Sequence, residues 1–256
     1  MARYKLILAY DGAAFAGSQR QAVTARSRTG TARTVQGELE DALRSLGWQG
    51  RSLMLAGRTD AGAHASGQVA AVDLDWPHAP DALRDALNAR LRFELVVRDA
   101  EAVAAKFHPR FDAQSRRYRY RLFCQHVRDP LRERFAWRVW PAFDTDILVQ
   151  TAPLFVGRHD FGAFGSAPAK QAGTVRALFQ AEWRPCGTSG CWQFDVAADA
   201  FLYRMVRRLV YVQVAVAQGR CSRDAVFRAL ESGSGSNGLP AGLAPAHGLE
   251  LMQVDY

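Results

Sequence analysis

The residue types best suited to chemistry lie together in one glycine-rich segment, AGRTDAGAHASGQ, at positions 56–68. This segment carries the guanidinium of Arg58, the carboxylate of Asp60 and the imidazole of His64. Glycine permits positive φ angles and a close approach of the backbone to a ligand. An ionised carboxylate here could act as a nucleophile, with Arg58 as the natural counter-charge, since a nearby cation lowers a carboxyl pKa. Arg58 could also, or instead, hold a phosphate. Alternatively, Asp60 and His64 could simply form hydrogen bonds within their own loop.

Arginine dominates the charge of the chain. Lys and Arg total 33 against 25 acids, which gives a net charge of +8, and only three of the 33 are Lys. Codon bias can enrich arginine, but here the arginines cluster: positions 110–138 hold nine with three acids, and positions 200–223 hold five with none. Such clusters predict a polyanionic partner. The candidate phosphate contacts are Arg20, Arg26, Arg28, Arg204, Arg207 and Arg208.

Composition argues against several other classes of protein. No apolar run approaches the roughly 20 residues of a membrane span, and the N-terminus lacks the apolar stretch of a signal peptide. The four cysteines form no CxxC pair and have no histidines at zinc-ligand spacing. Cys186 and Cys191 could bridge a hairpin, but two thiols are favoured for a protein of the cytoplasm. We therefore expect a cytoplasmic protein without a metal or a cofactor.

Hydrophobic periodicity predicts the elements that position this loop. Thr34 should cap a helix that ends at Gly47, and Pro80 should begin another. The alternation in RRYRYRL places Tyr118 and Tyr120 on one face of a strand. The remaining predictions are strands at 4–10, 52–56, 68–74, 95–98, 116–124, 175–183, 192–198 and 249–255, helices at 145–155 and 201–218, and a basic loop at 20–33.

These elements predict an α+β fold with two similar halves, residues 1–105 and 106–256. Each half should contain a mainly antiparallel sheet with helices, and the halves should flank a basic cleft. The glycine-rich loop falls in the first half, and the Tyr118 strand and the 201–218 helix fall in the second.

The segment GRTDAGAHA closely resembles the signature of the tRNA pseudouridine synthase A family, with Ala63 where Val is usual. Further segments resemble the family in the family's order along the whole chain. They are RYKLILAYDGAAFAGSQ, TVQGELEDAL, FHPRFDAQSRRYRYRLF, GRHDFGAF, AFLYRMVRRLV and LAPAHGLELMQVDY. Six supporting segments in order make the resemblance specific.

The resemblance implies an isomerase that converts uridine to pseudouridine at positions 38, 39 and 40 of the tRNA anticodon stem-loop, without a cofactor. It implies that Asp60 is the nucleophile and that Tyr118 stacks on the target base. It also places Leu249 near the active site and implies a homodimer that holds tRNA. A stacked aromatic ring would offset part of the cost of unstacking the nucleotide.

The chain departs from the family pattern at a few positions. Ser18 stands where Trp is usual, Arg92-Phe93 replaces Leu-Pro, Tyr211 replaces Gly, and the basic loop is longer. Two other functions remain open from the residues alone. One is a non-catalytic RNA chaperone, which would explain the arginine clusters. The other is a metal-dependent nuclease that combines Asp60 with Asp11, Asp73 or Asp75, although no paired-carboxylate spacing supports it.

Overall fold

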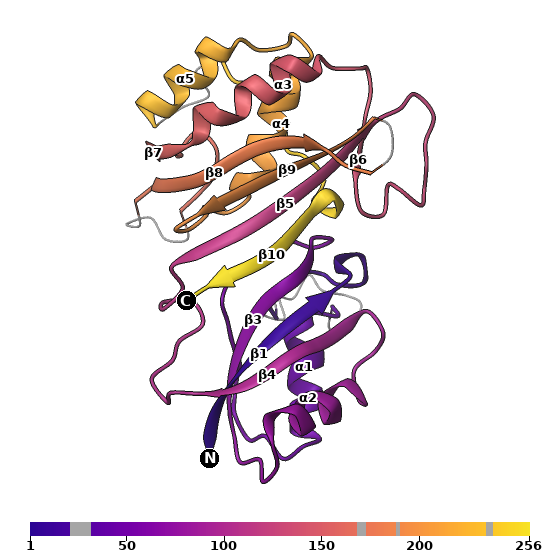
Figure 1. Cartoon of the computed structure of the whole chain (residues 1–256), viewed down its shortest axis with the longest axis vertical. Helices are drawn as coiled ribbons and strands as arrows, with labels where there is room; N and C mark the ends of the chain where they lie inside the picture. The colour runs from indigo at the N-terminus through magenta and orange to yellow at the C-terminus, as the bar shows by residue number, and fades with distance from the viewer. Residues whose placement is uncertain (21–31, 168–172, 188–189, 234–237) are drawn as a thin grey trace, which may run out of the picture. The chain divides into compact units, whose positions relative to one another are not determined.

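The computed structural model describes residues 1–20, 32–167, 173–187, 190–233 and 238–256 (Figure 1). Their contacts form two compact units. Residues 1–114 and 251–256 make up the first, and residues 115–250 make up the second. Both units combine helices with a mainly antiparallel sheet, so the predicted α+β class is confirmed. Within the described residues, no helix is long and apolar enough to cross a membrane.

The sheet of the first unit is centred on β1 (Ala2–Tyr10). This strand runs antiparallel to β3 (His64–Leu74) on one side and to β4 (Leu95–Val103) on the other, and β2 (Met54–Leu55) pairs with β3. Alternate residues of β1, from Tyr4 to Tyr10, are buried as its sequence pattern predicts. The end of β10 (Leu249–Asp255) also belongs to this unit, where Gln114 N donates to Asp255 O at 2.8 Å.

Two amphipathic helices complete the first unit. Thr34 caps α1 (Val35–Arg44) by accepting a hydrogen bond from Gly37 N, and α2 (Pro80–Asn88) begins at proline. The two helices contact one another, and α2 packs against β4 (Figure 1). Both helix starts therefore agree with the sequence analysis.

The second unit contains the antiparallel strands β5 (Ser115–Cys124), β9 (Cys191–Ala198), β8 (Val175–Pro185) and β7 (Gly157–Asp160), in that order. A short strand, β6 (Trp137–Val139), runs parallel to β5. The helices are α3 (Thr145–Thr151), α4 (Met205–Ala217) and α5 (Arg223–Ser232), and α3 packs on α4. Short 3-10 turns occupy Gly12–Ala14, Ala152–Phe155 and Ala246–Gly248.

Several boundaries differ from the sequence prediction. Strand β4 ends at Val103 rather than at residue 98, and helix α1 ends at Arg44 rather than at Gly47. Strand β3 begins at His64 rather than residue 68, so it includes the end of the glycine-rich segment. Strand β2 keeps only two of the five predicted residues. Helix α4 begins at Met205 rather than residue 201, because Tyr203 pairs with Ser166 in an isolated bridge and Arg204 adopts a left-handed conformation.

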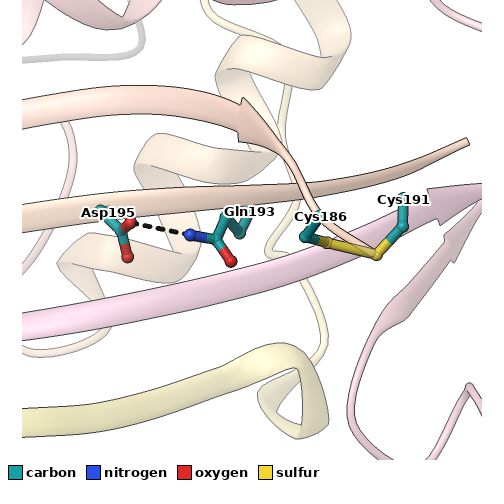
Figure 2. The surroundings of a disulfide bond; sticks show 4 residues. All are labelled: Cys186, Cys191, Gln193 and Asp195. Atoms are coloured by element: carbon teal, nitrogen blue, oxygen red, sulfur yellow. Dashed lines mark hydrogen bonds between the residues drawn. A yellow bond between two sulfur atoms is a disulfide. The ribbon is translucent and has the colours of Figure 1, made fainter. Parts of the chain in front are cut away.

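The cysteines Cys186 and Cys191 form a disulfide at the end of the β8–β9 hairpin (Figure 2). The prediction of two separate thiols is therefore wrong. The two residues face one another across the hairpin, where Cys186 N donates to Cys191 O at 2.9 Å, and their Cα atoms lie 5.2 Å apart. This separation lies within the range that a disulfide spans.

Candidate active site

The glycine-rich loop connects β2 to β3 and folds into a tight turn at Asp60. Ala63 N donates to Asp60 O at 3.0 Å, and Gly62 between them has a φ of 83°. Such a positive φ at the third position of a turn favours glycine. Asp60 is half-buried, whereas Arg58 is exposed. The turn therefore leaves the Asp60 side chain partly accessible on a backbone of defined conformation.

Thr59 ties this loop to β1 and to the segment before α1. Its N–H donates to Ser18 Oγ at 2.8 Å, and its carbonyl accepts from Ser18 N at 3.2 Å. Its hydroxyl forms a 2.8 Å hydrogen bond with the Tyr10 hydroxyl. Gly17 makes the close approach possible, because its φ is 102° and a Cβ there would lie 3.2 Å from Thr59 O.

Tyr10 is a neutral hydrogen-bonding group in this cluster. Burial raises its pKa to about 12, and this effect exceeds the opposing effect of its hydrogen bonds to Thr59 and Gln68. The fully buried Gln68 also donates to Gly57 O at 3.0 Å. Sequence analysis did not identify Tyr10, Ser18, Thr59 or Gln68 as functional. The only sequence signal was the placement of two polar residues, Thr59 and Gln68, in or beside the glycine-rich loop.

His64 connects the glycine-rich loop to the segment that follows β1. It is buried, and its Nδ1 accepts a hydrogen bond from Gly12 N at 3.0 Å. The backbones approach so closely that a Cβ on Gly12 would lie 2.1 Å from Ala63 O. The hydrogen bond at Nδ1 therefore joins His64 to the segment after β1 and is not one within its own loop.

The role of Arg58 as the counter-charge of Asp60 stays a prediction. In the parts of the chain that the structure describes, Arg58 forms no ion pair. Its exposed guanidinium is consistent with the second role considered for it, which is to hold a phosphate.

Two further residues that the sequence predicts for the site, Tyr118 and Leu249, belong to the second unit. Tyr118 is buried on β5, and its ring packs edge-on against Phe201 with centroids 5.0 Å apart. Tyr120 shares its face of the strand, as the alternation predicted, and is fully buried. Leu249 is buried at the start of β10, directly after Gly248, whose backbone lies close to the Tyr120 ring.

The candidate phosphate contacts have different environments. Arg20 pairs with the buried carboxylate of Glu40 at 3.1 Å. Arg207 donates to Ala244 O, and Arg208 donates to two backbone carbonyls while burial lowers its pKa. Arg204 is exposed, and its guanidinium lies 4.7 Å from the centre of the Tyr203 ring. Arg26 and Arg28 lie outside the described residues.

The carboxylates proposed for a nuclease do not assemble a metal site. Asp73 is bound by Arg3 at 2.6 Å, and Asp75 pairs with the N-terminal amine at 3.5 Å. Across the described residues, no group of three or more His, Cys, Asp or Glu side chains could hold a metal ion.

Known proteins resemble the chain along its whole length. A family model described as tRNA pseudouridine synthase matches residues 151–256. Proteins named tRNA pseudouridine synthase A are 38% identical in Geobacter sp. (100% of this chain and 99% of the relative) and 39% identical in Methylacidiphilum infernorum (99% and 95%). The protein of the same name in Solidesulfovibrio magneticus is 40% identical, and the alignment covers 100% of this chain and 92% of the relative. Because identity at this level extends over both units, the chain belongs to the tRNA pseudouridine synthase A family.

Proposed function

We propose that Asp60 is the nucleophile with which this tRNA pseudouridine synthase isomerises uridine, and that its targets are positions 38, 39 and 40 of the anticodon stem-loop. Family membership supports the activity. The observation that supports the role of Asp60 is its half-buried carboxylate, which lies on a tight turn. The preceding residue, Thr59, is hydrogen-bonded through its N–H, its carbonyl and its hydroxyl. A nucleophile needs this combination of access and fixed position.

The reaction balances within the substrate and the protein. The N1–C1′ bond of uridine breaks, the base turns, and a new bond joins C5 to C1′, while the proton on C5 is lost and N1 gains one. No electrons are gained or lost overall. Asp60 would form a transient covalent bond to the sugar or to the base and leave again when the new bond is complete. For this step the carboxyl group must be ionised.

The other site residues would act on binding and orientation. The exposed Arg58 guanidinium would hold a phosphate near the target nucleotide, as a planar fork with several donors. The Tyr118 ring would stack on the target base, and Leu249 would form part of the wall of the base pocket. Arg20, Arg26, Arg28, Arg204, Arg207 and Arg208 are the proposed contacts to the RNA backbone.

We further propose that two copies of the chain bind tRNA as a homodimer in the cytoplasm. The argument is one of size, since a 256-residue chain offers a small patch for gripping a whole tRNA. Sedimentation of the protein with and without tRNA would measure this stoichiometry directly.

The central test is Asp60→Asn. This change keeps the size and polarity of the side chain but removes its charge and nearly all of its nucleophilicity. We expect normal folding and tRNA binding, with tritium release from C5-labelled uridine in tRNA reduced to background, because the covalent route is lost. The matched control is Asp41→Asn, an exposed acid of α1 in the same unit, which should release tritium at the wild-type rate.

The same assay separates the alternatives. An RNA chaperone would release no tritium even as the wild-type protein. A nuclease would cut the tRNA and require magnesium. Clear tritium release by folded Asp60→Asn protein would disprove the role of Asp60 while leaving the family activity in place.

A further inference from the structure

Thr59, the residue between Arg58 and Asp60, uses every polar group that it has. Its N–H and carbonyl are paired with Ser18, at 2.8 and 3.2 Å, and its hydroxyl is paired with Tyr10 at 2.8 Å. Ser18 is fully buried, and Tyr10 and Thr59 are 5% and 8% exposed. Thr59, which directly precedes Asp60, is therefore held through its backbone N–H, its backbone carbonyl and its side-chain hydroxyl.

A second layer of hydrogen bonds supports these contacts. Gln68, on β3, donates to Gly57 O at 3.0 Å and to the Tyr10 hydroxyl at 3.4 Å. Ser18 is anchored in turn, because its carbonyl accepts from Gln36 N in the first turn of α1 at 2.9 Å. Hydrogen bonds at Gly57 and Thr59 thus connect the loop to β1, to β3 and to the start of α1.

Stability alone does not require such a cluster. Apolar residues of similar shape could fill the same space without the cost of removing four polar side chains from water. The polar cluster adds a defined loop conformation, because hydrogen bonds are directional and fix the backbone angles of the loop as well as its position. A displacement of about 1 Å at a reacting group can slow a reaction roughly 100-fold.

We infer that Thr59 is a positioning residue for Asp60, and that the hydrogen-bonded cluster of Tyr10, Ser18, Thr59 and Gln68 holds the Asp60 carboxylate in one attacking geometry. This inference rests on the proposed role of Asp60. Thr59 itself touches no reacting atom. Its hydroxyl acts through the backbone that it shares with Asp60.

The test compares Thr59→Val, which replaces the hydroxyl by a methyl group of similar size, with Thr59→Ser, which keeps the hydroxyl. We expect Thr59→Val to lower kcat for pseudouridine formation by about 10- to 100-fold, with the tRNA Kd changed less than about twofold. Thr59→Ser should recover most of kcat. Thr151→Val is the matched control, since Thr151 is also buried and its hydroxyl donates to a backbone carbonyl, but it lies in α3.

A double variant separates positioning from stability. Tyr10→Phe leaves the Thr59 hydroxyl without its partner, whereas Tyr10→Phe with Thr59→Val removes both groups together. Removing both members of a buried pair is close to neutral for stability. We therefore expect the double variant to recover much of the melting temperature that Tyr10→Phe loses, apart from the part that comes from the 3.4 Å hydrogen bond between Gln68 and the Tyr10 hydroxyl, while kcat stays as low as in Thr59→Val.

Recovery of kcat together with the melting temperature would overturn the inference, since Thr59 would then matter only for folding. Full activity of Thr59→Val would overturn it as well. Neither result affects the proposed function, which depends on the inactivity of Asp60→Asn measured beside these variants. Tritium release by Asp60→Asn would instead disprove the role of Asp60, whatever Thr59→Val does.

Discussion

The ring and the hydroxyl of Tyr118 make separable contributions to the proposed site. The ring is held edge-on against Phe201, so a phenylalanine at position 118 can occupy the same place. Stacking on a base contributes roughly 1–3 kcal/mol and needs only the ring. We expect Tyr118→Phe to keep most of the tRNA affinity and much of the activity, and Tyr118→Leu to lose considerably more activity. Initial rates of tritium release measure the activity of each variant, and a binding titration measures its tRNA affinity. If the Phe variant were as inactive as Asp60→Asn, the hydroxyl would take part in the chemistry.

Individual site residues differ in how well the sequence predicts them. Asp60 and Tyr118 stand in short, recognisable segments, so a resemblance is enough to propose their roles without a structure. The partners of Thr59 could not be found in this way, because Ser18 and Tyr10 lie 41 and 49 positions away. Their proximity follows from the packing of β1 and α1 around the loop. Arg58 is a different case, because its closeness to Asp60 in the chain predicts a counter-charge, and that role stays a prediction.

Single strands and helices were predictable where the local pattern was strong. The alternation in β1 and β5 and the helix starts at Thr34 and Pro80 are set by neighbouring residues, and the structure confirms them. Helix α5 was missed, although Ser222 caps it by accepting from Ala225 N. The start of α4 depends on a bridge to Ser166, which is distant in sequence and so leaves no local signal.

The pairing of β1 with β3 brings opposite charges together. Arg3 stands opposite Asp73, and their side chains form two hydrogen bonds of 2.7 and 2.6 Å. This hydrogen bonding lowers the pKa of Asp73 below its usual value. Because the pKa is lower in the folded chain, the pair stabilises the fold above about pH 4 and ceases to do so as the pH falls through the folded pKa. Solvent screening keeps the contribution below about 1 kcal/mol, since the side chain of Asp73 is 38% exposed.

We therefore expect Asp73→Asn to lower the melting temperature at neutral pH and to have little effect well below the folded pKa of Asp73. Thermal unfolding followed by circular dichroism at both extremes measures the difference. Asp75→Asn is the control, because its side chain is 95% exposed and it lies two residues away, directly after the same strand. An equal loss of melting temperature for Asp73→Asn at both extremes would show that the pKa of Asp73 does not govern the effect.

The net charge of the chain overstates the number of arginines that are free of ion pairs and can bind RNA phosphates. Many arginines that contribute to the net charge of +8 are already bound to acids. Arg119 pairs with the nearly buried Asp195, and Arg121 pairs with Glu250. Arg33 is bound by both Glu38 and Glu94. The arginine clusters seen in the sequence therefore include residues that hold the fold together, and such arginines contribute less to binding an RNA backbone than exposed, unpaired ones.

This distinction predicts how tRNA binding depends on salt. Each phosphate that an arginine neutralises releases counterions, so the slope of log Kd against log salt counts the contacts. Arg204 is exposed and forms no ion pair within the described part of the chain, whereas Arg84 pairs with Asp81 and Asp85. We expect Arg204→Gln to reduce the slope by about one and Arg84→Gln to leave it unchanged. Titrations of labelled tRNA from about 50 to 200 mM salt cover the range in which affinity falls steeply. Equal slopes for wild type and Arg204→Gln would mean that Arg204 is merely solvated, and the proposed phosphate contacts would then have to lie among the other arginines.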